Sequence, residues 1–313
     1  MGRGRLTRGR ALHGVLLVDK PAGASSHHVL QQVRRGLDAR KAGHAGTLDP
    51  LATGMLPVLL GEATKLAGYL LAADKAYETT LTLGVETDSL DADGEVTRRR
   101  AVPAGLDRAA VEAAAVRFRG AQQQVPPMVS AIKVDGRRLY RAAREGLEIE
   151  RSARDIVIRD LQVLAVLGDT VRLSVRCSKG TYIRVLAADL GDALGCGAHV
   201  QALRRTWVAP FETAPMYTPD TIAARGDACL LPLDAGLQHL PRVTVDADGV
   251  AELRQGRSVR VQSSAAGDGD DPPAVPGGPG ASIWRVYGPQ DGLIALGVLD
   301  ADGIVAPSRV LQV

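Results

Sequence analysis

Aromatic residues, cysteines and long apolar runs are all scarce in this chain of 313 residues. With two Trp, six Tyr and two Phe, it has few side chains for stacking on a ligand. Three Cys without a Cys-x-x-Cys pair, and six scattered His, speak against a disulfide framework and a structural zinc site. No apolar stretch approaches the roughly 20 residues of a membrane helix. The sequence therefore predicts a protein that binds no metal and does not span a membrane.

The N-terminus is basic rather than apolar. Four arginines lie among the first ten residues, and the apolar run that follows, 15–18, stops at Asp19. A secretory signal peptide has a longer apolar region and a small-residue cleavage site. Residues 1–11 are therefore predicted to be a disordered basic arm, and the protein is predicted to be cytoplasmic.

Length and charge indicate two domains. The composition, 45% hydrophobic and 23% charged, is that of a globular protein and excludes wholesale disorder. Residues 1–240 carry a net charge of +6 and residues 241–313 one of −3. A basic body with a mildly acidic tail is compatible with a polyanionic partner.

The body, residues 12–240, mixes strands, helices and hairpins without the βαβ rhythm of a parallel sheet. The predicted strands cover 14–18, 55–60 (broken by Pro57), 77–83, 156–167 and 171–177. The predicted helices begin after Ser25 or Ser26, run from Asp107 to Gly120, and cover 138–145 and 182–194. This pattern predicts an α+β catalytic domain with a central mixed, mainly antiparallel sheet and flanking helices.

The tail, residues 241–313, has the texture of short strands. Within it, 263–282 consists almost wholly of Gly, Pro, Ala, Ser and Asp, which offer little apolar area to bury. Strand patterns resume at 283–287 and 292–299. We therefore expect a small C-terminal β-barrel with a disordered insert at about 263–282.

The densest candidate for chemistry is the glycine-rich segment 41–54. Its glycines allow the backbone to approach a ligand closely, and it carries His44 and Asp49. It lacks the Gly-Lys-Ser/Thr of a phosphate-binding loop. Taken alone, the segment favours a tight turn in which Asp49 is a turn residue or helix cap and His44 is structural.

A second candidate segment is 177–184, which holds Tyr182 and Arg184. In an extended chain these two side chains share a face, and an Arg facing a carboxylate would hold it ionised. The alternative is a strand-to-helix junction with a surface Arg. Three other positions also have structural alternatives. Tyr77 can be a core tyrosine, Lys20 a solvated lysine, and 203–206 a solvated face.

Taken together, these segments resemble bacterial tRNA pseudouridine-55 synthase, the TruB family of pseudouridine synthases, in order and spacing. The matching motifs are 19–26 (DKPxGxSS), 43–57 (GHxGTLDPLATGMLP), 61–65 (GEATK), 75–77 (KAY), 87–94 (TDSLDADG), 124–133 (QVPPMVSAIK), 178–184 (SKGTYIR) and 199–205 (HVQALRR). The resemblance is strong over residues 12–240. The tail is similar, with weaker motifs, to the family's small PUA-like RNA-binding barrel.

The resemblance implies an isomerase that converts a uridine in the tRNA T loop to pseudouridine with no cofactor and no metal. The target base is flipped out of its stack. Asp49 falls on the family's nucleophile and Arg184 on the arginine paired to it. Tyr77 falls on the tyrosine that stacks on the flipped base.

Four further positions are implied to bind substrate or to support the catalytic loop. Tyr182 and Leu203 match pocket-lining residues, and His44 matches the histidine that fills the space left by the flipped base. Lys20 matches the lysine that supports the loop. The partner is the T arm of tRNA, and the protein is expected to be a monomer.

Two other classes of function compete with this hypothesis. The first is a non-catalytic tRNA-binding or RNA-folding protein on the same scaffold. The second is a metal-dependent hydrolase that uses His44 and Asp49, which the lack of a ligand cluster disfavours. A nucleophile, a paired Arg and a stacking Tyr together favour an enzyme over a binding protein.

The composition of the tail generates a first test. Deletion of residues 264–281 should leave the melting temperature and the activity nearly unchanged, because the segment has almost no apolar side chains to bury. Thermal unfolding of the deletion variant measures this. A melting temperature several degrees lower would mean that the segment is packed.

Overall fold

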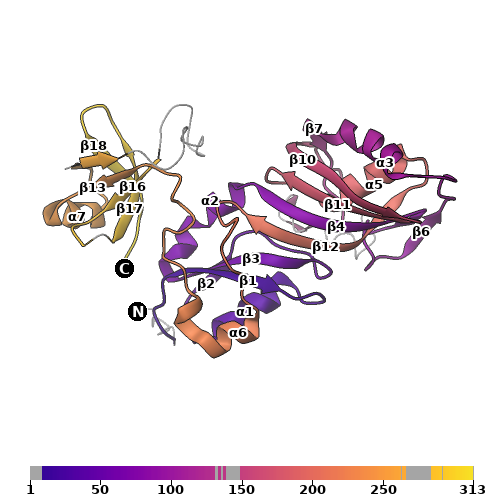
Figure 1. Cartoon of the computed structure of the whole chain (residues 1–313). Coiled ribbons are helices and arrows are strands. Elements are labelled where there is room, and N and C mark those ends of the chain that lie inside the picture. Colours follow the sequence, from indigo (N-terminus) through magenta and orange to yellow (C-terminus); the bar gives the residue numbers. More distant parts are fainter. Residues whose placement is uncertain are drawn as a thin grey trace.

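The structure is a computed structural model that describes residues 9–130, 133–134, 137–138, 149–261, 263–265, 283–290 and 292–312. These residues form a large sheet-based body and a smaller C-terminal domain of strands and one helix (Figure 1). Residues 1–8 of the predicted arm and nearly all of the helix predicted at 138–145 lie outside the described residues.

An eight-stranded sheet organises the body, in the order β1-β3-β12-β4-β11-β10-β7, with β2 paired to β3. Its strands are β1 (Gly14–Lys20), β2 (Ala42–His44), β3 (Thr53–Leu60), β4 (Lys75–Leu83), β7 (Gly120–Gln124), β10 (Arg154–Leu167), β11 (Thr170–Cys177) and β12 (Ala198–Val208). Of the described pairings in this sheet, only that of β12 with β3 is parallel. The predicted mixed, mainly antiparallel sheet is confirmed.

Helices and two small hairpins surround the sheet. The α-helices are α1 (Ser26–Gly36), α2 (Ala67–Ala72), α3 (Arg108–Ala115), α5 (Ile183–Ala193) and α6 (Pro219–Arg225), and the 3-10 helices are η1 (Gly61–Leu66), η2 (Val116–Phe118) and η3 (Gly226–Cys229). The hairpins are β5 (Val85–Thr87) with β6 (Val96–Arg99), and β8 (Lys133–Val134) with β9 (Arg137–Arg138). Helices α3 and α5 lie together over one face of the sheet (Figure 1).

Local sequence explains where these helices begin. Ser25 caps α1, and its hydroxyl accepts a hydrogen bond from the backbone N–H of His28. Asp107 caps α3 in the same way, as predicted. Helix α3 ends at Ala115, well before the predicted end at Gly120, because the chain tightens into η2 and Gly120 already begins β7.

Strand β3 corrects the expectation that Pro57 breaks it. The strand is continuous from Thr53 to Leu60, and Pro57 pairs with Leu17 of β1. Its carbonyl still accepts a hydrogen bond from Ala45. A proline fits here because it removes only a donor, and its fixed φ is compatible with an extended chain.

The C-terminal domain is a six-stranded sheet in the order β14-β18-β17-β16-β13-β15, which curls into a half-barrel with helix α7 beside it (Figure 1). Its elements are β13 (Arg242–Thr244), α7 (Ala247–Arg254), β14 (Val259–Arg260), β15 (Ser263–Ala265), β16 (Ile283–Tyr287), β17 (Leu293–Leu299) and β18 (Ile304–Val310). This half-barrel is consistent with the predicted PUA-like domain.

The predicted disordered insert begins with ordered structure. Strand β15 lies within 263–282 and pairs antiparallel with β13, from Arg242 opposite Ala265 to Thr244 opposite Ser263. Disorder is therefore the wrong prediction for these three residues, because backbone pairing needs no apolar side chain. The rest of the insert, 266–282, lies outside the described residues. Because 263–265 are paired with β13, the deletion test should start at 266.

The body and the C-terminal domain share an apolar contact. Leu66 and Tyr69 pack with a buried cluster that includes Leu240 and Leu311. The Lys65 ammonium donates to the carbonyl of Val310 at 2.8 Å.

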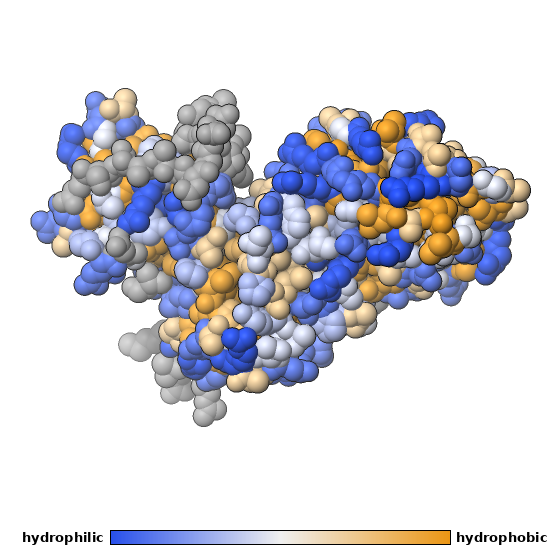
Figure 2. Space-filling model, viewed as in Figure 1, coloured by the Kyte–Doolittle hydropathy of each residue, from blue (hydrophilic) through white to orange (hydrophobic). Residues whose placement is uncertain are grey.

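No described helix is long and apolar enough to cross a membrane. The face seen in Figure 2 is a mixture of hydrophilic and apolar areas over both parts.

Candidate active site

The loop between β2 and β3, residues 45–52, presents Asp49 and is tied down on both sides of it. The Ser26 hydroxyl donates to the carbonyl of Leu48 at 2.9 Å and accepts from its N–H at 2.8 Å. The Lys20 ammonium donates to the carbonyl of Pro50 at 3.1 Å. The backbone immediately before and after Asp49 is therefore anchored to α1 and to the end of β1.

Lys20 is a structural cation and not a solvated lysine. Its side chain is fully buried, and besides Pro50 it donates to the carbonyls of Pro21 and Ala24 at 2.8 and 2.6 Å. Burial lowers its pKa to about 8, so it is still largely protonated at neutral pH. It can hold the Asp49 loop as predicted.

Arg184, the second residue of α5, joins the two candidate segments. Its side chain is 2% exposed, and its Nε lies 3.0 Å from a carboxylate oxygen of Asp49. Its Nη1 lies 3.4 Å from a carboxylate oxygen of Asp91 and donates to the carbonyl of Ser89 at 2.7 Å. Its Nη2 donates to the carbonyl of Val129 at 2.7 Å. The alternative of a surface Arg is therefore wrong.

Asp91 is the residue that sequence reasoning missed. It precedes the turn between β5 and β6, with a 5% exposed side chain that accepts hydrogen bonds from the Ser89 hydroxyl and the Asp93 backbone. Its place in the 87–94 motif, together with the counter-charge that a buried Arg184 requires, was the available signal.

The protonation of Asp49 reflects opposing influences. Burial raises the pKa of its carboxyl above the usual value, and the Asp91 charge raises it further. Arg184 and Lys20 oppose this increase. Asp49 is still 37% exposed, so a ligand can reach it.

Asp49, Asp91 and Arg184 line a cavity of about 980 Å³, and His44 lies in its wall. The Nδ1 of His44 is buried and has no hydrogen-bond partner. Burial, together with the charge of Arg205, lowers the pKa of His44, so the ring is neutral at neutral pH. Among the described residues, no group of three or more His, Cys, Asp or Glu is placed to hold a metal ion.

Tyr77 lies in the core at 8% exposure on β4, opposite Arg205 of β12. Burial raises the pKa of its hydroxyl, so Tyr77 keeps its proton at neutral pH. Arg205 is 1% exposed and donates to the carbonyls of Met55 and Gly46 at 2.7 and 2.9 Å. The alternative of a solvated face at 203–206 is therefore wrong for Arg205. Its bond to Gly46 supports the glycine-rich loop.

Tyr182 has a different geometry from the one expected. It is the N-cap of α5 with an extended backbone, and the chain turns into the helix at Ile183. Tyr182 and Arg184 therefore do not alternate along one extended segment. Tyr182 is nevertheless near the site, because the charge of Asp49 adds to burial in raising its pKa.

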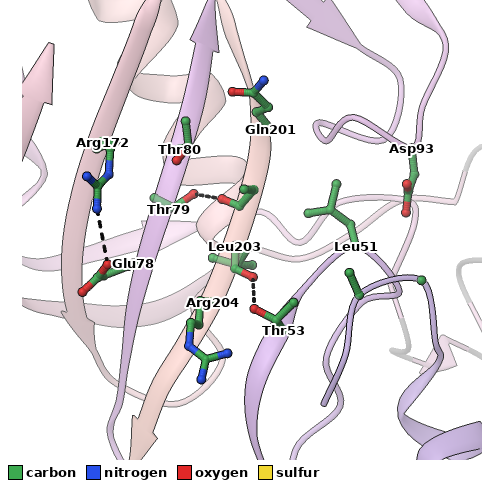
Figure 3. A pocket seen from close by; sticks show the side chains of 13 residues that line it. Leu51, Thr53, Glu78, Thr79, Thr80, Asp93, Arg172, Gln201, Leu203 and Arg204 are labelled. Atoms are coloured by element: carbon green, nitrogen blue, oxygen red, sulfur yellow. Dashed lines mark hydrogen bonds and ion pairs between the residues drawn. The ribbon is translucent and has the colours of Figure 1, made fainter. Parts of the chain in front are cut away.

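Leu203 borders a second cavity, of about 490 Å³, on β4 and β12 (Figure 3). Its carbonyl accepts from the Thr53 hydroxyl at 3.4 Å, where β12 meets β3. Leu51 and Asp93 lie across this cavity from Glu78, as Figure 3 shows. Asp93 lines both cavities, so Leu203 is next to the Asp49 site and outside its lining.

Three family models together match most of the chain. Residues 34–183 match "TruB family pseudouridylate synthase (N terminal domain)", residues 184–238 match "tRNA pseudouridylate synthase B C-terminal domain", and residues 241–311 match "Pseudouridine synthase II TruB, C-terminal". A protein of Chromohalobacter salexigens named "tRNA pseudouridine synthase B" is 51% identical over 264 residues, covering 83% of this chain and 86% of that protein. One of Aeromonas salmonicida with the same name is 45% identical, covering 100% of this chain and 98% of that protein.

The fold also has a relative among solved structures. A chain in the structure described as "Crystal Structure of a Cbf5-Nop10-Gar1 Complex" is similar with a TM-score of 0.71 and 27% identity. The similarity covers 96% of this chain and 85% of that one, so it includes both the body and the C-terminal half-barrel.

The contact of Arg184 with two carboxylates generates a test. Asp91→Asn should lower the pKa of Asp49, because it removes a negative charge that raises this pKa. Arg184 then faces one carboxylate instead of two, so its positive charge acts more strongly on Asp49. An NMR titration of the carboxyl carbons measures the shift. Asp93→Asn, two residues further on, is the control and should leave the pKa of Asp49 unchanged. An unmoved Asp49 pKa in Asp91→Asn would contradict the coupling.

Proposed function

The chain belongs to the TruB family of pseudouridine synthases, and we propose that the uridine it isomerises in tRNA is the one at position 55 of the T loop. The motif resemblance supports this position, and the role of Asp49 as the reacting group is supported most directly by its ion pair with Arg184, in the wall of a cavity of about 980 Å³. A partly exposed carboxylate on an anchored loop is suited to attack a bound nucleotide.

The reaction exchanges one bond of the ribose for another and loses no atoms. The bond from N1 of uracil to C1′ breaks, the base turns, and C5 bonds to C1′; C5 then loses its proton, and N1 gains one. Asp49 acts as the nucleophile, at the sugar or at the base. Either attack requires an ionised carboxylate, and the Arg184 guanidinium favours that form and fixes its orientation.

Tyr77 and its neighbours receive the base. A phenol ring stacks on a flipped uracil, and the protonated hydroxyl of Tyr77 can relay the proton that leaves C5. Leu203 lines the adjoining cavity of about 490 Å³, and Tyr182 stands at the start of α5, two residues before Arg184. Lys20 supports the loop, as its bond to Pro50 suggests.

Base flipping supplies the access that this arrangement needs. An enzyme cannot reach C1′ of the ribose and C5 of the uracil while the base is stacked, so the nucleotide leaves the T loop and enters the cavity. His44, neutral and with its Nδ1 unpaired, takes the place that the base has left. Affinity comes mainly from contacts of Lys and Arg with phosphates, and it falls as salt concentration rises.

Asp49→Asn should abolish isomerisation and leave tRNA affinity within a fewfold of wild type. The amide keeps the size of the carboxylate but is not a useful nucleophile, and phosphate contacts spread over a wide surface carry the affinity. Tritium release from C5-labelled uridine in tRNA measures turnover, and filter binding at fixed salt measures affinity. Turnover near wild type would defeat the nucleophile assignment. A wild-type protein that binds tRNA without turnover would support the RNA-binding alternative.

Tyr77→Phe should reduce turnover by much more than it reduces RNA binding. Phenylalanine keeps the ring that stacks on the base and loses the hydroxyl that relays the proton. The same two assays, run side by side on this variant, make the comparison. Equal losses in both would assign Tyr77 to binding or folding.

A further inference from the structure

Gln124, the last residue of β7, holds the start of the helix that carries Arg184. Its side chain is buried at 6% exposure. The side-chain carbonyl accepts from the backbone N–H of Tyr182 at 2.7 Å, and the side-chain NH₂ donates to the backbone carbonyl of Tyr182 at 3.1 Å. One carboxamide therefore binds both polar groups of a single residue, as a neighbouring strand would.

Tyr182 needs this partner because of its position. It is the N-cap of α5, its own side chain makes no capping hydrogen bond, and its N–H faces outward from the helix. Arg184 follows two residues later, so the orientation of the first turn sets where its guanidinium lies. Gln124 thus fixes the backbone from which Arg184 reaches Asp49 at 3.0 Å.

The residues after Gln124 contact the same arginine. Five positions along the chain, the carbonyl of Val129 accepts from Nη2 of Arg184 at 2.7 Å. Residues 124–129 therefore hold Arg184 twice, through the backbone of its helix and through its side chain. The chain between these two contacts is itself held by Arg151, whose guanidinium donates to the carbonyl of Pro126 at 3.1 Å.

We propose that Gln124 is a positioning residue for the isomerisation, which acts through the backbone of Tyr182 to keep Arg184 aligned with the Asp49 carboxylate. This inference rests on the proposed function. Gln124 touches neither Asp49 nor Arg184 in any described contact, so its loss should change the alignment of the ion pair without removing a reacting group. A displacement of about 1 Å at a catalytic group can lower a rate roughly a hundredfold.

The direction of the effect on Asp49 follows from the charges. The Arg184 guanidinium lowers the pKa of Asp49 against the influence of burial. If Arg184 moves away, the pKa of Asp49 must rise, and the pH below which activity is lost must rise with it. A residue that only supports the fold would lower the melting temperature and leave this pKa in place.

The test compares Gln124→Met with Gln122→Met. Gln122 lies two residues earlier on the same strand, and its side chain donates to the carbonyl of Phe118 at 2.5 Å, a bond within the turn that precedes β7. Gln124→Leu is the second variant, since it also removes both hydrogen bonds to Tyr182 and, like Gln124→Met, adds no charge that would itself shift the Asp49 pKa. The measurements are the single-turnover rate of pseudouridine formation at saturating tRNA, the Kd for tRNA, the melting temperature and the Asp49 pKa by NMR.

Both Gln124 variants should lose about tenfold to a hundredfold in rate, keep Kd within about threefold, and raise the Asp49 pKa. Gln122→Met should match wild type in all four measurements. The proposal is overturned if the Gln124 variants keep the wild-type Asp49 pKa, whether or not their stability falls, or if Gln122→Met loses as much rate. An inactive wild type would overturn the proposed function instead, and the Asp49 pKa, which needs no turnover, would still decide the role of Gln124.

Discussion

A buried guanidinium between two carboxylates is the interaction on which the site depends. Arg184 is 2% exposed, and its buried charge is compensated by Asp49, by Asp91 and by backbone carbonyls. Removing one partner of a buried ion pair typically costs about 3–5 kcal/mol, because the remaining charge stays buried without compensation. The loops that carry these acids are therefore constrained to meet the first turn of α5. The contact with Arg184, which favours the ionised form of Asp49 against the effect of burial, also restricts the movement of its side chain.

The supports of this cluster come from elements that are far apart in the sequence. Lys20, at the end of β1, holds the carbonyl of Pro50, and Arg205 of β12 holds the carbonyl of Gly46 from the other side of the loop. Strands β3 and β12 pair at Thr53 and Gly54, which lie opposite residues 204–205. Gly54 is required at this place. Gly54 has φ +97°, and a Cβ there would lie 2.2 Å from the carbonyl oxygen of Arg205. The chain can therefore leave the loop and enter β3 next to β12 only because residue 54 has no side chain.

Much of this architecture was predictable from local pattern. Strand 77–83 alternates between buried and exposed positions as its sequence indicates, and Ser25 and Asp107 cap their helices as small polar residues do. The motif resemblance also predicted that Asp49 and Arg184 meet. Two expectations failed because local preference yielded to pairing elsewhere. Pro57 remains within a strand that pairs with β1 and β2, and Ser263–Ala265 form a strand against β13 although serine and alanine offer little apolar area.

The sequence by itself determined the family, the class of fold and which acid, base and aromatic side chains are available for the chemistry. It did so because hydrophobic period, capping residues and motif spacing are all written in short stretches of chain. Only the tertiary structure decided the environment of each group. Arg205 and Lys20 could be solvated charges in a linear pattern and are buried, and Asp91 and Gln124 stood within motifs without a role of their own. Burial, counter-charge and many of the hydrogen-bond partners come from residues far apart in the chain, such as Asp49 and Arg184 or Gly46 and Arg205, and a local pattern does not give the environment in which they meet.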